Sequence, residues 1–206
     1  QVFEEAFIFA TTGTELSTEW SKTIINECNT IKREISAQDI DSRKDLRSLN
    51  FVTIDGSNAK DFDDAVYAEE SSDGYLLYVA IADVSEYVLQ DSSLDKEALS
   101  RATSVYFEKK VIPMLPELIS NKLCSLRPNE EKLVLTCEIY LDKEGEIKSF
   151  EFFNSVICSK NRLTYDEVEK FYQKGQTTLS DDIVSNLSTL KKIHALRRKI
   201  REERKA

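Results

Sequence analysis

The fold and the chemistry of this chain are decided by one stretch, FVTIDGSNAKDFDDAV at residues 51–66. It begins as an apolar run that stops at Asp55-Gly56, and it returns to apolar residues at Ala65. Four aspartates fall within ten residues of it: Asp55, Asp61, Asp63 and Asp64. The apolar residues interleaved with them are Ile54, Phe62, Ala65 and Val66. These apolar side chains should draw the segment toward the core and hold the carboxylates in a cleft.

Carboxylates crowded in such a place repel and desolvate one another unless a cation offsets their charge. Mg²⁺ suits this pattern, because it is a hard ion that takes oxygen ligands and keeps part of its water shell. Bound ions of this kind polarise a phosphodiester and activate water. If residues 61–64 were extended, Asp61 and Asp63 would point to one side and Asp64 to the other. We therefore expect a loop or a bulge here.

The alternative interpretation is a polar loop whose exposed aspartates have only a structural role. A Ca²⁺ loop of the EF-hand type is excluded by position. Counting from Asp55, the sixth residue is Lys60 rather than Gly and the twelfth is Val66 rather than Glu. The spacing alone leaves a metal-dependent phosphodiester site and a structural acidic loop both open.

Short apolar runs and turn signals around this stretch predict an α+β fold with antiparallel hairpins. One hairpin joins residues 65–67 to 75–81, and a second joins 133–141 to 147–158. Apolar periodicity and capping residues predict helices over residues 20–35, 93–101 and 117–123, directly after Thr164, and along 183–196. The other segments are expected to be a strand at 6–10, a loop or connecting arm at 36–50 and an extended segment at 105–114.

The composition indicates a packed globular chain with an acidic surface. The 206 residues are 41% hydrophobic and carry a formal net charge of −9, with 28 Lys and Arg against 37 Asp and Glu. That balance argues against a typical basic nucleic-acid-binding module, although the local charge decides binding. No apolar run approaches the length of a membrane span, so we expect none. Because the sequence starts at Gln1 rather than Met, we expect a fragment or a processed piece.

The four cysteines favour free thiols over a disulfide framework. They are Cys28, Cys124, Cys137 and Cys158, and they are scattered along the chain. Neither their spacing nor the single histidine, His194, matches the pattern of a zinc site. Such buried thiols are typical of a reducing compartment, so we expect a cytoplasmic protein.

Further motifs accompany the aspartates in a fixed order: RKDLRSL at 43–49, VAIADVS at 79–85, TSVYF at 103–107, VIPMLP at 111–116, LCSL at 123–126 and RLTY at 162–165. Together with residues 53–66, they closely resemble the catalytic RNB domain of the ribonuclease II / ribonuclease R family, and most of all its bacterial ribonuclease R branch. The resemblance covers roughly the whole chain and is strongest over 43–167. It implies an α+β, RNB-type catalytic domain with a mixed sheet, of which this chain carries the N-terminal half.

The resemblance also implies an activity: a Mg²⁺-dependent, processive, hydrolytic 3′→5′ exoribonuclease that releases nucleoside 5′-monophosphates from the 3′ end of single-stranded RNA. By motif, Asp55 and Asp64 match the main metal ligands, and Asp61 supports them. Asp63 matches the carboxylate most critical for hydrolysis. Tyr106 matches an aromatic residue that stacks on a base near the 3′ end, which suits an enzyme that accepts any sequence. The alternative for Tyr106 is a core tyrosine in a strand.

The sequence departs from the family pattern in two places. Glu86 stands where the family commonly has His, which puts an anion in place of a cation near the RNA contacts. The family's second half carries a motif of the form SPIRRY, whose arginine stabilises charge on the scissile phosphate, and this sequence has no such segment. The cold-shock and S1 domains that usually flank the catalytic domain are also absent from it. We therefore expect an N-terminal strand, helix and connecting arm at 1–50, followed by half of an RNB domain at 51–206.

Two functional hypotheses follow. The first is an exoribonuclease centre that lacks full activity as a fragment, and the second is a non-catalytic RNA- or metal-binding or scaffold module that keeps the fold. The four intact aspartates favour the first. The last predicted helix ends in a cluster of arginines, Arg197, Arg198, Arg201 and Arg204. These side chains either contact RNA phosphates or form a solvated face of the helix.

Overall fold

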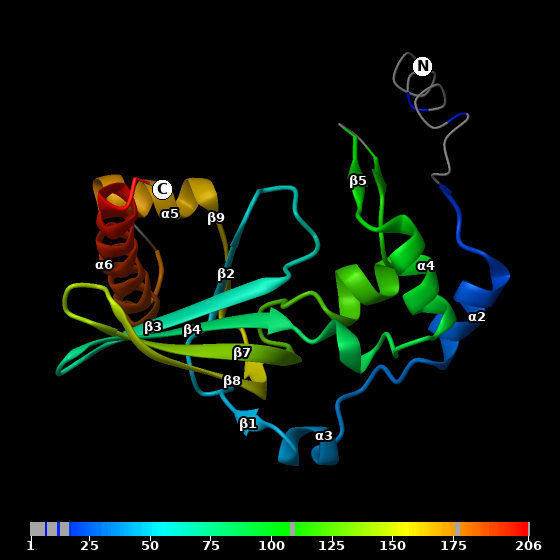
Figure 1. Cartoon of the computed structure of the whole chain (residues 1–206), viewed down its shortest axis with the longest axis horizontal. Coiled ribbons are helices and arrows are strands. Elements are labelled where there is room, and N and C mark those ends of the chain that lie inside the picture. The colour runs from blue at the N-terminus through cyan, green and yellow to red at the C-terminus, as the bar shows by residue number, and fades with distance from the viewer. Residues whose placement is uncertain (1–6, 8–11, 13–16, 108–109, 176–177, 206) are drawn as a thin grey trace. The chain divides into compact units, whose positions relative to one another are not determined.

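The computed structural model describes residues 7, 12, 17–107, 110–175 and 178–205. The chain divides into two compact units (Figure 1), one formed by residues 1–33 and 84–123 and the other by residues 34–83 and 124–206. We call them unit 1 and unit 2. The strand expected at residues 6–10 lies outside the described residues except for Phe7, and the expected domain boundary at residue 50 stays a prediction.

Unit 2 is built on a seven-stranded mixed sheet with the strand order β1-β8-β7-β4-β3-β2-β9. The two outer pairs, β1 with β8 and β2 with β9, are parallel, and the inner pairs are antiparallel. The strands are β1 (Lys44–Asp45), β2 (Val52–Asp55), β3 (Asp64–Ser71), β4 (Gly74–Ala82), β7 (Glu131–Asp142), β8 (Ile147–Cys158) and β9 (Asn161–Thr164). The predicted α+β fold is confirmed.

Both predicted hairpins form, because their turns carry the residues that tight turns need. In the β7–β8 turn, the side chain of Asp142 accepts hydrogen bonds from the backbone N–H groups of Glu144 at 3.0 Å and Glu146 at 2.8 Å. Gly145 has a φ of +86°, which glycine adopts at little cost. At the β3–β4 turn, a Cβ on Gly74 would lie 1.9 Å from the Leu141 carbonyl oxygen, so only glycine fits.

Two helices, α5 (Tyr165–Lys174) and α6 (Asp181–Glu203), pack on unit 2's sheet (Figure 1). Their apolar residues meet those of β2 and β9 in one core: Val52, Leu163, Val168, Ile183 and Leu187. Asn186 is 1% exposed and ties α6 to its surroundings. Its side chain accepts from the Ala68 N–H at 2.9 Å and donates to the Asn50 carbonyl at 2.9 Å.

One face of the sheet continues beyond the helices as exposed apolar surface. The α6 helix covers it near Leu77 and Ile139, which pack against a buried cluster that includes Ile193 of α6. Further along β4, β7 and β8, strand pairing puts four more apolar side chains on this same face, and each is exposed by 43–64%. They are Ile81, Leu135, Phe150 and Phe152. We call these four residues the open apolar face.

Unit 1 is smaller and mainly helical. Its helices α2 (Lys22–Thr30) and α4 (Ser93–Arg101) contact each other, and its two short strands β5 (Val105–Tyr106) and β6 (Val111–Ile112) form a hairpin. A 3₁₀ turn, η1 (Val84–Glu86), and a π-helical turn, η2 (Ile119–Leu123), complete the unit. The Arg101 guanidinium lies over the Trp20 ring at 3.8 Å from its centroid, which is a cation–π distance.

Several expectations need correction. The loop expected at 36–50 contains the helix α3 (Ala37–Asp41) and the strand β1. The helix expected over 20–35 ends at Thr30, and the extended segment expected at 105–114 is a hairpin whose two central residues, 108–109, are not described. All four cysteines are free thiols, as expected. Among the described helices, none has the length and apolar character that crossing a bilayer requires.

Candidate metal centre

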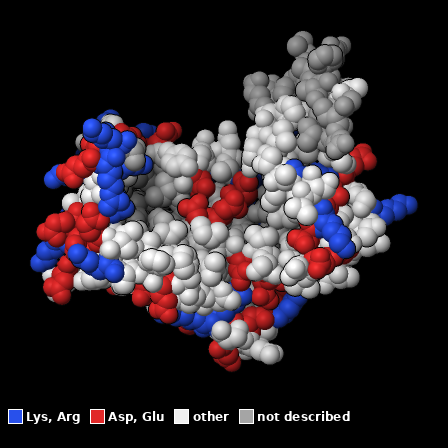
Figure 2. Space-filling model, viewed as in Figure 1, with Lys and Arg blue, Asp and Glu red and all other residues white. Residues whose placement is uncertain are grey.

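The four aspartates lie on and around the connection between β2 and β3. Asp55 is the last residue of β2, and Asp64 is the first residue of β3. Because the two strands are antiparallel, with Val52 opposite Val66, these two aspartates meet at the same edge of the sheet. Figure 2 shows acidic side chains gathered over this connection. The expected loop is confirmed, since residues 56–63 form no strand.

The C-terminal half of the connection is anchored by Ser125, which is fully buried. Its hydroxyl donates to the Lys60 carbonyl at 2.9 Å and accepts from the Phe62 N–H at 3.1 Å. The Phe62 carbonyl accepts from the Leu126 N–H at 2.8 Å, and the Asp63 carbonyl accepts from the Ala82 N–H at 2.9 Å. These bonds hold the buried Phe62 in place, and the burial of this residue agrees with the prediction that interleaved apolar residues draw the segment toward the core. Asp61, on one side of it, is partly exposed, and Asp63, on the other, is exposed.

Burial and the neighbouring carboxylates raise the pKa values of two of the aspartates, Asp55 and Asp63. Burial raises the pKa of the Asp55 carboxyl above its usual range, and the charges of Asp64 and Asp61 act in the same direction. Burial also raises the pKa of Asp63, and the charges of Asp61, Asp64 and Asp55 add to it. All four predicted site aspartates therefore lie close enough to interact, and each gains from a nearby cation.

Buried polar atoms without partners mark the same place. Among the described residues, the buried side-chain atoms that lack a hydrogen-bond partner are Thr53 Oγ1, Asp55 Oδ2 and Arg162 Nε. All three lie on β2 and β9, where Thr53 pairs with Arg162. An unpartnered buried carboxylate oxygen is costly, and a bound ion or water is a usual explanation for one.

The donor set fits Mg²⁺. No group of three or more His, Cys, Asp or Glu residues lies close enough to hold a metal ion in the described part of the chain. Mg²⁺ does not need such a group, because it is usually held by one or two carboxylates and completes its octahedron with water and substrate phosphate oxygens. Asp55 and Asp64, at the adjoining ends of β2 and β3, are the pair of carboxylates that could hold such an ion.

Two further residues of the sequence motifs, Ser125 and Arg162, lie at this centre. Ser125 belongs to LCSL and anchors the connection from one side. Arg162 belongs to RLTY, and its guanidinium donates to the Gly56 and Ser57 carbonyls. The only sequence signal for either residue was membership of a motif, because their partners lie 63 or more residues away.

The predicted RNA contacts lie elsewhere in the chain. Tyr106 ends β5 in unit 1 and is 67% exposed, so it is not the core tyrosine of the alternative interpretation. Glu86 ends the 3₁₀ turn η1 of the same unit and is also exposed.

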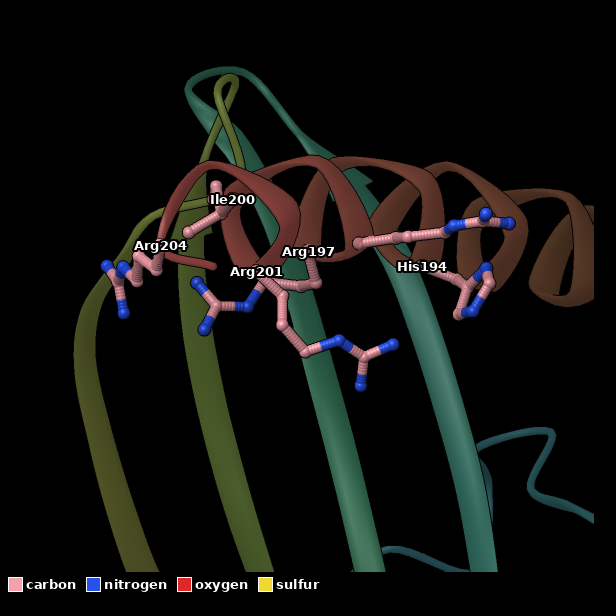
Figure 3. Close-up of a pocket in the computed structure, with 6 residues that line it drawn as sticks. His194, Arg197, Ile200, Arg201 and Arg204 are labelled. Carbon is pink, nitrogen blue, oxygen red and sulfur yellow. The ribbon is translucent and has the colours of Figure 1, made fainter. Parts of the chain in front are cut away.

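The arginines at the end of α6 line a pocket of about 320 Å³ together with His194 and Ile200 (Figure 3). Arg197 and Arg204 pair with Glu146 at 3.7 and 3.4 Å, and Arg198 pairs with Glu202 at 2.8 Å. Three of the four arginines therefore have acidic partners within the protein itself.

Comparison with known proteins gives this centre a family. The RNB domain matches residues 43–206. The chain belongs to the RNB domain family. That match begins at the first residue of the RKDLRSL motif and includes all four aspartates.

Curated RNB relatives and solved structures agree with this assignment. The chain is 46% identical to ribonuclease R of Buchnera aphidicola over 184 residues and 42% identical to ribonuclease R of Escherichia coli over 188, covering 84% and 90% of this chain. The structure of Mycoplasma genitalium RNase R in complex with double-stranded RNA matches 97% of this chain and 35% of that chain, with a TM-score of 0.89 and 33% identity. Yeast Ssd1, a pseudonuclease, shares the fold, with a TM-score of 0.68 and 22% identity over 81% of this chain and 20% of its own.

The match covers only part of the relatives. The chain spans 25% of the length of the Buchnera relative and 23% of the Escherichia coli relative.

Proposed function

We propose that this chain carries the carboxylate centre of a Mg²⁺-dependent, hydrolytic exoribonuclease that shortens RNA from its 3′ end and releases nucleoside 5′-monophosphates. One observation carries the proposal. The four aspartates of the RNB motif surround a single strand connection, where their charges interact and one carboxylate oxygen is buried without a partner. Such an arrangement binds a divalent cation well and is unfavourable without one.

Each aspartate takes a role that its place supports. Asp55 and Asp64, at the adjoining strand ends, would hold the ion, and Asp61 would support them. When bound, Mg²⁺ polarises the scissile phosphate and makes water a better nucleophile. Asp63 directly precedes Asp64 in the motif, and its match to the family's carboxylate most critical to hydrolysis makes it our choice for the group that takes a proton from the attacking water.

RNA is the substrate that the relatives suggest. Mycoplasma genitalium RNase R has been solved with double-stranded RNA and with ribose-methylated single-stranded RNA. In this chain the exposed ring of Tyr106 is suited to stacking on a base, an interaction that every base permits. We place the activity in the cytoplasm, where the four free thiols stay reduced, and expect cold-shock and S1 domains to assist RNA binding in the complete protein.

The test is an RNA degradation assay with single-stranded RNA labelled at its 5′ end. The 206-residue chain is compared with a chimera in which it replaces the matching segment of Escherichia coli ribonuclease R. We expect a ladder that shortens from the 3′ end with Mg²⁺ and no degradation with EDTA, with the chimera far more active than the chain alone. Internal cleavage, or a ladder that persists in EDTA, would contradict the proposal.

The first variant to test in that chimera is Asp63→Asn. We expect turnover to fall by a factor of about 100 or more, the usual size of a lost proton-transfer group, with RNA binding nearly unchanged. Filter binding in EDTA measures affinity separately from cleavage. Asp73→Asn, in the exposed β3–β4 turn, is the matched control and should degrade RNA normally. Normal turnover by the Asp63 variant would overturn its assignment.

The same assay distinguishes this proposal from the second hypothesis, in which the chain is a non-catalytic binding module. Fold alone does not establish turnover, since a pseudonuclease shares this fold. An inert chimera that still binds RNA and Mg²⁺ would favour the binding module.

A further inference from the structure

Arg162, on β9, reaches the start of the connection that carries the aspartates. One of its terminal nitrogens, Nη2, donates to the Gly56 carbonyl at 2.7 Å and to the Ser57 carbonyl at 2.9 Å. Gly56 directly follows Asp55, where β2 ends. A second bond tightens the same turn, because the Ala59 N–H donates to the Gly56 carbonyl at 3.1 Å. The backbone leaves β2 along a path that one side chain fixes.

The same guanidinium also contacts the far part of the connection. It lies over the ring of Phe62, with 5.5 Å between its central carbon and the ring centroid, which is within cation–π range. Phe62 sits between Asp61 and Asp63 and is 9% exposed. Arg162 therefore links the first residues of the connection to the residue between two of its carboxylates.

Charge adds to these contacts. The positive charge of Arg162 opposes the rise in the pKa of Asp55 that burial and Asp64 produce. Its Nε is buried and has no partner, in the same place as the unpartnered Asp55 Oδ2. A guanidinium is charged at every ordinary pH, so it offsets the repulsion of the carboxylates permanently without itself being a ligand.

We propose that Arg162 is a positioning residue of the metal centre: its bonds to Gly56 and Ser57 and its contact with Phe62 hold the connection so that Asp61 and Asp63 stay against Asp55 and Asp64. The proposal rests on the proposed function of these aspartates and gives a role to a residue outside their segment. Ser125 holds the other half of the connection, so the carboxylates are carried between two anchors.

The alternative is that Arg162 merely stabilises β9, and binding of Mn²⁺ separates the two. Mn²⁺ prefers the same oxygen ligands as Mg²⁺, and the signal of the free ion in electron paramagnetic resonance reports its affinity without any need for turnover. We expect Arg162→Met to weaken Mn²⁺ binding by about 10- to 100-fold, the usual effect of losing a group that orients a ligand. Arg198→Met removes the same charge from an exposed position on α6 and should leave the affinity unchanged.

Hydrogen exchange provides a readout that does not depend on the metal. In metal-free Arg162→Met, we expect faster exchange in residues 56–63, while the strand amides of β2 and β3 stay protected. Arg162→Lys keeps the charge, but its nitrogen ends one bond short of the position of Nη2. We therefore expect this variant to lie between wild type and Arg162→Met in both measurements.

The outcomes are distinct. Wild-type Mn²⁺ affinity and wild-type exchange in Arg162→Met would overturn the proposal, as would equal loss of protection throughout the sheet. If Arg162→Met fails to fold, Arg162→Lys decides, and wild-type behaviour of that variant in both measurements overturns the proposal. If the wild-type chain itself binds no Mn²⁺, the proposed metal centre fails, and the exchange of residues 56–63 alone decides whether Arg162 positions the connection.

Discussion

Among single residues, Asp55 and Asp63 affect stability through their raised pKa values. A carboxyl whose pKa is higher in the folded chain binds its proton more tightly there than in the unfolded chain. Its contribution to the free energy of unfolding is therefore greatest at low pH, and it falls as the pH rises from about 4 through the raised pKa. The two aspartates should therefore weaken the metal-free fold at neutral pH, although one of them is a proposed metal ligand.

This reasoning gives a prediction for Asp63→Asn without metal. Because the amide carries no charge, the variant should melt at a higher temperature than wild type, by a few degrees at about pH 7 and by progressively less as the pH falls toward about 4. Thermal melts followed by circular dichroism measure the difference, with Asp73→Asn as the control. Added Mg²⁺ should shrink it at neutral pH. A difference that does not change with pH would contradict the electrostatic explanation.

The sequence pointed to the aspartates of the proposed site but not to the residues that contact their segment. Asp61 and Asp63 stand out locally, because carboxylates alternate with apolar residues that must be buried. Arg162 and Ser125 have no such local contrast, since their partners lie 106 and 63 residues away along the chain. Their roles depend on strand pairing that no periodicity in the sequence specifies.

Among the elements, α5 begins with a reciprocal capping box. The Thr164 hydroxyl accepts from the Glu167 N–H at 3.2 Å, and the Glu167 carboxylate accepts from the Thr164 N–H at 2.7 Å. Thr164 is also the last residue of β9, opposite Asp55 in the parallel pair with β2. The start of α5 is thus coupled to β2, the strand that ends at Asp55.

We predict that Thr164→Ala lowers the free energy of unfolding by about 1 kcal/mol, the typical cost of losing an N-cap side chain. Urea denaturation measures it. Ser180→Ala is the control, because Ser180 occupies the N-cap of α6 and its side chain makes no capping bond. Equal losses in the two variants would show that the hydrogen bond is not what Thr164 contributes.

Capping side chains also explain which elements were predictable. The starts of α4 and α5 were found because Ser92 and Thr164 cap them within three residues, a purely local signal. Helix α3 carries a similar signal, a capping box between Ser36 and Asp39, but the polar residues around it favoured the prediction of a loop. Strands β1 and β9 had no local signal. Each is two to four residues long and exists by pairing in parallel with a strand more than a hundred residues away.

At the scale of the whole molecule, the open apolar face leaves part of the described sheet uncovered. Phe150 and Phe152 are 64% and 61% exposed, and their rings contact each other at 5.8 Å between centroids. Contiguous apolar surface of this kind promotes association between molecules.

We predict that the isolated chain self-associates at micromolar concentration and that replacing Phe150 and Phe152 together by Ser shifts it toward the 23.6-kDa monomer. Sedimentation velocity measures the shift. Leu99→Ser, which removes an apolar side chain that is 80% exposed in unit 1, is the control and should change nothing. A wild-type chain that stays monomeric over the whole concentration range would contradict this prediction.

The course of the chain between the two units has a consequence for how the protein can vary. Residues 84–123 leave unit 2 after β4 and return before β7, yet nine residue pairs fix the register of those two strands without them. Both junctions adjoin the same backbone, because the Ala82 and Leu126 N–H groups bond to the consecutive carbonyls of Asp63 and Phe62. This segment therefore has the topology of an insertion in a hairpin loop. Evolution can lengthen it, exchange it or retune its aromatic residues while the carboxylates remain on an unbroken stretch of chain.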